Sequence, residues 1–379
     1  MSVYLDNAAT TKTCEPAVSA AFYCMVENFG NPSSLHKMGV DAEQVLSDAR
    51  KAIASAVVCK PESVYFTSGA TESNNTAIMG AAAIYGKRRK KIVTTSIEHP
   101  SVEEPLKYLE EHGFQVVRIA PDRNGEIDYE ELVASVDDNT CLVTCMLVNN
   151  ETGYILPVKR AFMRIKRDYP ECITHCDAVQ GFLKIPIKST ELYADMISLS
   201  AHKVHGIKGI GALIVKKGIR LAPIVRGGGQ EKSLRSGTES VPLIAGFGAA
   251  VSALHPNISA AYENAVALNL SLRKKLSALE GAVVHSKEDL CSPYILNVSV
   301  AGIRSEILLH YLESREIYVS SGSACSKGAK STVLRQFGIN DKEADCAIRI
   351  SFSRETTQRD IDLLVETMQE GCRTLIKTK

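Results

Sequence analysis

A lysine at position 203 has the clearest chemical potential in this sequence. It stands just beyond a short apolar segment, 196–199, and closely follows Ser200 and His202. A lysine held where buried strands end loses solvent, and this desolvation favours the neutral, nucleophilic amine that can form a Schiff base with a carbonyl group. Most single lysines are exposed surface residues, so the assignment depends on the groups that accompany Lys203.

Polar residues with complementary chemistry follow other apolar segments. Residues 67–71, Thr-Ser-Gly-Ala-Thr, open a predicted helix, whose free N–H groups and dipole favour an anion. His99 and Asp177 each follow a predicted strand. A semi-buried Asp177 needs a cationic or N–H partner, which its sequence neighbours do not supply. Taken singly, the first feature is more often a plain helix cap and His99 more often a structural histidine.

Pyridoxal phosphate would satisfy all of these groups together. It needs a cradle for its phosphate, a carboxylate for its ring nitrogen, an imidazole or aromatic face for its ring, and a lysine for its aldehyde. Residues 67–71, Asp177, His99 and Lys203 supply these four functions in that order. The sequence therefore predicts a pyridoxal phosphate site at the ends of successive strands, where open α/β sheets bind ligands.

The elements that must position these groups alternate between strands and helices. Apolar patterns predict strands at 63–67, 91–95, 114–119, 140–148, 173–176, 196–199 and 211–215, and helices at about 40–57, 71–85 and 102–112. This alternation predicts an α/β fold, with a mainly parallel sheet covered by helices on both faces. From about residue 257 the pattern changes to a helix at 260–279, a strand at 294–300 and a last helix at about 360–376. We expect an N-terminal segment (1–13), a large domain (14–256) and a smaller α+β domain (257–379).

Composition limits the possible partners and the cellular compartment. With 44 basic and 43 acidic residues among 379, the net charge of +1 gives no reason to expect direct nucleic-acid or membrane binding. We expect no membrane span, because no apolar run approaches about 18 residues, and no signal segment at the N-terminus. The eleven cysteines form no CxxC pair, so we expect free thiols, no metal site and a reducing cytoplasm.

The sequence resembles the cysteine desulfurases of the NifS/IscS type, within the fold-type I pyridoxal phosphate enzymes, over essentially its whole length. The resemblance rests on short motifs, which are Tyr4–Thr11, Gly30–Ser34, Phe66–Asn74, Glu98-His99, Asn149–Glu151, Asp177–Gln180, Ser200–Lys203, Gly227–Glu231, Arg235–Thr238, Ser321–Cys325 and Arg349–Ser351. The last cysteine motif is the most specific of them. Ala201 and Ser353 stand where glycine is common in the family, and the segment after Cys325 is shorter than in long-loop members.

The resemblance implies a role for each matching residue. Lys203 would hold the cofactor and move protons at the substrate carbons, Asp177 would pair with the ring nitrogen, and His99 would stack on the ring as an acid/base. Gln180 would bond the ring hydroxyl. The implied cofactor-binding set is Ala70, Thr71, His99, Asn150, Asp177, Gln180, Ser200, His202, Lys203 and Thr238, with Thr238 supplied by the partner of a homodimer. Asn150 and Arg349 would grip the carboxylate of L-cysteine, and Arg349 would do so bidentately.

Cys325 would take the substrate sulfur as a persulfide, release L-alanine and pass the sulfur to an acceptor protein. The acceptor would be an iron–sulfur scaffold or a tRNA-thiolation protein. The local sequence supports this role for Cys325. Residues 320–331 contain no large apolar side chain that could be buried, so we expect a mobile, exposed loop. Lys327 and Lys330 would favour the thiolate.

Three alternatives remain open from the sequence. A selenocysteine lyase or an aminotransferase of the same fold would share Lys203 and Asp177 without needing a mobile thiol. A non-catalytic nucleotide-binding module would be colourless, whereas a sulfur carrier or scaffold would use Cys325 without the cofactor set.

Overall fold

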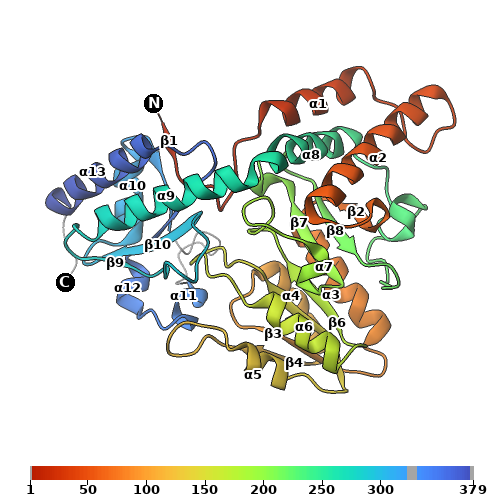
Figure 1. Ribbon diagram of the computed structural model, residues 1–379, viewed down its shortest axis with the longest axis horizontal. Helices are drawn as coiled ribbons and strands as arrows, with labels where there is room; N and C mark the ends of the chain where they lie inside the picture. The colour runs from red at the N-terminus through yellow and green to blue at the C-terminus, as the bar shows by residue number, and fades with distance from the viewer. Residues whose placement is uncertain (1, 322–330, 376–379) are drawn as a thin grey trace.

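A seven-stranded sheet carries the strands that end in polar groups. The computed structural model describes residues 2–321 and 331–375, and Figure 1 shows this sheet in its lower right part. The strands run in the order β2 (Val64–Thr67), β8 (Gly211–Val215), β7 (Met196–Ser200), β6 (Ile173–Asp177), β5 (Thr140–Met146), β3 (Lys91–Thr95) and β4 (Gln115–Ile119). Neighbouring strands from β7 to β4 are parallel, whereas β8 is antiparallel to both of its neighbours. The prediction of a mainly parallel sheet is confirmed.

Helices cover both faces of this sheet, because its central strands are apolar on both sides. On one face Ile92 and Leu142 join a core cluster with the helices α3 (Ala70–Tyr85) and α4 (Pro100–Glu111). On the other face Val93 and Val143 join the main core cluster. The helices of the large-sheet part that contribute to that cluster include α2 (Lys37–Val57), α5 (Tyr129–Ala134), α6 (Val158–Asp168), the short α7 (Ser189–Leu192) and α8 (Val241–Leu254).

The C-terminal part is built on a four-stranded antiparallel sheet, on the left in Figure 1. Its strand order is β12 (Ser320–Ser321), β13 (Ala347–Ser351), β10 (Ile295–Val300) and β9 (Ala282–Val284). The helices of this part are α9 (Ile258–Leu276), α10 (Ser305–Glu313), α11 (Thr332–Gln336), α12 (Asp341–Asp345) and α13 (Gln358–Thr374). The first strand of the chain, β1 (Val3–Tyr4), pairs in parallel with β11 (Ile317–Tyr318), so the chain begins against its own C-terminal part.

A nearly continuous helical run joins the two parts. Helix α8 leads through a 3-10 turn, His255–Asn257, directly into α9, which crosses the molecule in Figure 1. We predicted a domain boundary at this turn. The three-part division itself stays a prediction, and at the predicted boundary the chain passes from one helix to the next through this turn, with no extended linker.

The same run corrects the expectation of no apolar segment long enough to span a membrane. Val241–Leu276 is long and apolar enough by composition, and half of its most apolar window is buried inside the structure. Helix α8 packs on α2 and on α1 (Glu15–Val26) at very short distances. A Cβ atom at Gly248 would lie 2.7 Å from the Cβ of Ala49, and one at Gly246 would lie 3.0 Å from the Ala17 carbonyl. These packing contacts identify α8 as a core helix.

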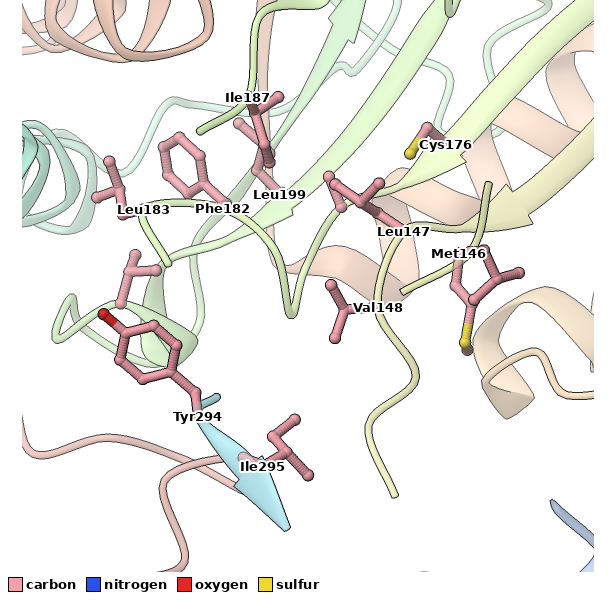
Figure 2. Packing of buried hydrophobic residues seen from close by; sticks show 14 of the residues in the cluster. Met146, Leu147, Val148, Cys176, Phe182, Leu183, Ile187, Leu199, Tyr294 and Ile295 are labelled. Atoms are coloured by element: carbon pink, nitrogen blue, oxygen red, sulfur yellow. The ribbon is translucent and has the colours of Figure 1, made fainter. Parts of the chain in front are cut away.

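The main core continues from the large sheet into the C-terminal part. Figure 2 shows Met146, the last residue of β5, with Leu147 and Val148 after it, in one cluster with Tyr294 and Ile295 at the start of β10. Tyr294 and Leu183 also line the same small cavity. This shared apolar contact places the start of β10, and with it the paired strand β13, close to the ends of the large-sheet strands.

Candidate cofactor and active site

The strand register aligns the predicted cofactor residues along one edge of the large sheet. Asp177 pairs with Ser198 near the end of β7, and Ser200, the last residue of β7, pairs with Gly211. Gly211 in turn pairs with Thr67, the last residue of β2. The ends of β6, β7 and β2 therefore lie at the same edge, together with the beginning of β8.

The N-terminus of α3 lies beside Ser200. A Cβ atom at Gly211 would lie 2.8 Å from the Gly69 backbone, so the glycine permits the turn before α3 to approach the sheet closely. A Cβ atom at Gly69 would meet nothing within 4 Å, which leaves open space at the helix start. Ser200 is buried, and its Oγ has no hydrogen-bond partner among the described residues. An orphaned hydroxyl beside a helix N-terminus fits a phosphate group.

Asp177 has two hydrogen-bond partners, and the expectation that its sequence neighbours supply none was wrong, because one partner is the backbone of Val179. Its Oδ1 accepts from the Val179 backbone N–H at 3.0 Å, and its Oδ2 accepts from Asn74 Nδ2 at 2.8 Å. The carboxylate is nearly fully buried, so these bonds fix its direction. A carboxylate fixed in this way suits the protonated ring nitrogen of pyridoxal phosphate.

His99 is the N-cap residue of α4, and its ring is largely desolvated. Its Nδ1 accepts from the Ser101 backbone N–H at 3.1 Å and lies 2.8 Å from Ser101 Oγ. Burial lowers the pKa of His99, the charge of Asp177 opposes this, and the charge of Lys203 adds to the lowering. Hydrogen bonds through Asn74 and Ser101 also link Asp177 to His99, so the structure brings these two residues together within reach of the Lys203 charge.

Glu98, next to His99, anchors the turn between β3 and α4. Its Oε1 accepts from Thr95 Oγ at 2.5 Å and from the Met146 backbone N–H at 3.0 Å. Burial raises the pKa of Glu98 to about 8, against these hydrogen bonds, so the side chain is mainly neutral at pH 7. The neutral Glu98 carboxyl therefore connects the turn that carries His99 to the end of β5, and it adds no negative charge to the site.

The N-terminal segment forms one wall around Lys203. Lys203 Nζ donates to the carbonyl oxygens of Ala8 at 2.8 Å and Ala9 at 2.6 Å. His202 Nδ1 lies 3.2 Å from Thr10 Oγ1. Burial lowers the pKa of His202 to about 4, aided by the nearby lysine charges, so its ring is neutral at pH 7.

A second, buried lysine supports Gln180. Gln180 Nε2 donates to the Ala8 carbonyl at 2.9 Å, and Lys184 Nζ donates to Gln180 Oε1 at 2.9 Å. Burial lowers the pKa of Lys184 to about 7, and the charges of Lys203 and Arg349 add to the effect. Since an ammonium group can only donate, Lys184 fixes the amide with its NH₂ group toward the N-terminal segment.

Arg349, in β13, reaches this site from the C-terminal sheet. Its Nη1 donates to the Asn150 carbonyl at 2.9 Å, and its Nη2 pairs with Asp6 Oδ1 at 2.8 Å. Its Nε is buried and has no hydrogen-bond partner among the described residues. Arg349 and Asn150 are therefore adjacent, as predicted, and a guanidinium with an unused donor suits a carboxylate ligand.

Two of the predicted site residues, Thr71 and Thr238, are exposed, and a third, Cys325, lies outside the residues that the structure describes. Thr71, in the first turn of α3, is exposed and lines an open cavity of about 590 Å³ together with His99. Thr238 is exposed on the loop before α8. Cys325, with its neighbours Lys327 and Lys330, lies outside the described residues.

The sequence reasoning missed several residues of the site. Asn74 and Ser101 join Asp177 to His99, Lys184 orients Gln180, and Asp6 pairs with Arg349. Asn74 lies within the motif Phe66–Asn74, and Lys184 follows Gln180 by four positions. Neither fact reveals that Asn74 contacts Asp177 or that Gln180 contacts the N-terminal segment. Across residues 2–321 and 331–375, no group of three or more His, Cys, Asp and Glu side chains could hold a metal ion.

Comparison with known proteins places these residues in a family context. Residues 3–364 match the family described as Aminotransferase class-V. The chain is 40% identical to a Vibrio atlanticus protein named cysteine desulfurase IscS, over 96% of this chain and 91% of that protein. It is 39% identical to a NifS/IcsS protein homolog of Lactobacillus delbrueckii subsp. bulgaricus, over 97% of this chain and 96% of that protein. A solved structure described as a NifS-like protein superposes with a TM-score of 0.94 at 36% identity, covering 99% of this chain and 100% of that one.

Proposed function

The chain belongs to the class-V aminotransferase family, and we propose that it acts as a pyridoxal phosphate-dependent cysteine desulfurase. It converts L-cysteine to L-alanine and passes the sulfur on as a persulfide of Cys325. The observation that carries the proposal is the convergence of Lys203, Asp177 and His99 at the sheet edge that holds Ser200, whose buried hydroxyl has no partner among the described residues. The similarity to desulfurases over nearly the whole chain favours this activity over a transamination or a purely carrier role.

Each group of the site has a task in this proposal. Bound pyridoxal phosphate supplies the electron sink that weakens the bonds around the substrate α-carbon. Lys203 holds the cofactor and moves protons at the substrate carbons, while Asp177 keeps the ring nitrogen protonated. Ser200, His202 and the α3 N-terminus, with Ala70 and Thr71, hold the phosphate. Gln180 donates to the ring hydroxyl, and Arg349 beside Asn150 binds the substrate carboxylate.

Products distinguish this proposal from the related activities. Purified protein supplied with L-cysteine, pyridoxal phosphate and a thiol reductant should release alanine and sulfide in equal amounts. An aminotransferase would instead need a keto-acid acceptor and would release a keto acid. Selenocysteine supplied in place of cysteine separates a selenocysteine lyase, which would release selenide and leave cysteine intact.

We propose that the active unit is a homodimer in which Thr238 completes the partner's phosphate site. Helix α1 and the turn after it expose large apolar side chains, which are Phe22, Tyr23, Met25, Phe29 and Leu35. An exposed apolar surface of this kind is typical of a protein interface. The open cavity beside Thr71 and His99 leaves room for a loop of a second copy, and Thr238 stands exposed on such a loop.

Subunit mixing tests the contribution of Thr238 directly. A dimer of one Lys203→Ala subunit and one Thr238→Ala subunit contains one doubly impaired site and one native site if Thr238 acts on the partner. If Thr238 acts within its own subunit, both sites are impaired and mixing restores nothing. Recovery of about half the native activity per dimer supports the proposal, and a fully active monomer at micromolar concentration contradicts it.

The sulfur acceptor is proposed to be a protein of iron–sulfur cluster assembly or tRNA thiolation in the cytoplasm. The ten cysteines of the described residues are all free, which fits a reducing compartment. Transfer of ³⁵S from labelled cysteine to candidate scaffold and thiolation proteins, followed on non-reducing gels, distinguishes the two pathways. The Cys325→Ser variant is the control, because it should label neither.

A further inference from the structure

The orientation of the Asn74 amide is fixed by its contact with Asp177. Asn74 is fully buried in α3, and its Nδ2 lies 2.8 Å from Asp177 Oδ2 and 2.8 Å from Ser101 Oγ. A carboxylate oxygen accepts hydrogen bonds, so the amide nitrogen must face Asp177. The Oδ1 of Asn74 has no partner among the described residues, but a flipped amide would set two acceptors against each other. Asn74 therefore donates to both Asp177 and Ser101.

The direction of the Ser101 hydroxyl follows from the Asn74 amide. Ser101 Oγ accepts from Asn74, so its own hydrogen is left for its other neighbour, His99 Nδ1, at 2.8 Å. The Ser101 backbone N–H, which can only donate, points at the same nitrogen at 3.1 Å. Two donors therefore meet at His99 Nδ1, which must carry a lone pair and no hydrogen.

A proton added to His99 has no favourable position in this arrangement. The neutral ring carries its hydrogen on Nε2, so a second proton would go to Nδ1. It would then oppose the Ser101 N–H and break that hydrogen bond, and the Ser101 hydroxyl would have to turn and accept from Nδ1 instead of donating to it. The charge of Lys203 also opposes an imidazolium, whereas that of Asp177 favours it. The N-cap position adds a third opposing effect, because the positive end of the α4 dipole meets the ring.

We propose that Asn74 and Ser101 are positioning residues that hold His99 as a neutral donor from Nε2, so that Lys203 rather than His99 accepts protons during the reaction. The inference rests on the proposed function and changes the role that the family resemblance gave to His99. Asp177, Asn74, Ser101 and His99 then form one hydrogen-bonded chain. These hydrogen bonds fix the position of the His99 imidazole relative to the Asp177 carboxylate, which is proposed to pair with the ring nitrogen of the cofactor.

The tautomer can be measured without any turnover. ¹⁵N-histidine NMR of the holoenzyme separates protonated from unprotonated ring nitrogens, and the loss of one signal pair in His99→Gln assigns His99. Between pH 5.5 and 8 the Nδ1 signal of His99 should stay unprotonated and the Nε2 signal protonated. In Ser101→Ala and Asn74→Leu this state should weaken, and His99 should titrate at higher pH than in the native protein. Ser73→Ala is the matched control, because Ser73 is the neighbour of Asn74 in α3 but its hydroxyl bonds Thr67 at the end of β2.

Kinetics of His99 variants give a second, independent reading. A glutamine amide can donate from about the position of Nε2 but cannot act as a base. His99→Gln should therefore keep kcat/KM within about tenfold of the native value and retain the acidic limb of the pH profile of kcat/KM. His99→Ala, which cannot donate, should lose more of kcat/KM. Loss of about 10²-fold or more in both variants, which is the usual contribution of a general base, would overturn the proposal. A protonated His99 Nδ1 would overturn the tautomer proposal even if the protein were a fully active desulfurase. A protein with the expected tautomer but no desulfurase activity would refute only the proposed function.

Discussion

Lys184 offers a prediction whose magnitude follows from its burial. Its side chain is 7% exposed, and burial lowers its pKa from 10.5 to about 7. At about 1.4 kcal/mol for each pH unit, this difference corresponds to about 5 kcal/mol of unfavourable free energy for the buried ammonium at pH 7. The unfolded chain keeps the ordinary pKa and binds the proton more tightly. Native stability should therefore rise with pH between about 7 and 10.5.

Lys184→Met removes this dependence while keeping a long apolar side chain. Between pH 7 and 8.5, the free energy of unfolding of the native protein should rise relative to that of the variant, by at most about 2 kcal/mol. The buried thiols oppose the rise as they titrate in the unfolded chain, but both proteins contain the same thiols, so the difference isolates Lys184. The measurement is urea unfolding at several pH values, with the denaturant slope compared between the proteins.

Lys188→Met is the matched control for Lys184→Met. The Lys188 side chain is 57% exposed and pairs with Glu191 on the surface, so its removal should leave the pH dependence unchanged. The same pH dependence in the native protein and in Lys184→Met would refute the reasoning. In that case Lys184 would keep its charge in the folded protein, through water that reaches Gln180.

Three further substitutions test the site and its support. Lys203→Ala should lose both the visible absorption band of the lysine-bound cofactor and all turnover, and a borohydride-reducible adduct surviving in that variant would place the cofactor lysine elsewhere. Asp177→Asn should still bind the cofactor, measured by absorbance, while slowing turnover strongly, and an unchanged rate would show that the ring nitrogen has another partner. Glu231→Gln should destabilise the fold by about 3 kcal/mol, because Arg50 pairs bidentately with a Glu231 side chain that is only 2% exposed. Asp41→Asn, in an exposed pair, should change the stability by less than about 1 kcal/mol in the same urea titration.

The positions of the main residues of the proposed cofactor site could be predicted from the sequence because they follow periodic signals. Asp177 comes directly after an apolar strand, and Ser200 ends the next one, so the parallel arrangement alone brings them to one edge. Residues 67–71 open a helix in a way that indicates an anion site. These inferences need only local pattern and the chirality rules of α/β folds.

The partners of these residues could not be predicted, because they depend on packing between distant segments. Asn74 lies 103 positions from Asp177, and Lys203 lies 195 positions from the Ala8 carbonyl that it bonds. Lys184 would be expected on the surface from its type, and only the fold shows that it is enclosed beneath Gln180. The long apolar α8–α9 run likewise needed the neighbouring helices α1 and α2 to be identified as core.

The central claim, that this protein removes sulfur from cysteine through a persulfide, is tested most directly by mass spectrometry of Cys325 after a single turnover. Holoenzyme mixed with one equivalent of L-cysteine without reductant should release one alanine per active site. The tryptic peptide that contains Cys325 should gain the mass of one sulfur atom and lose it again on reduction. Cys325→Ser should keep the cofactor band, form no persulfide on this peptide and release no sulfide. Sulfide release at the native rate from Cys325→Ser, or alanine formed without a persulfide on the native peptide, would contradict the account.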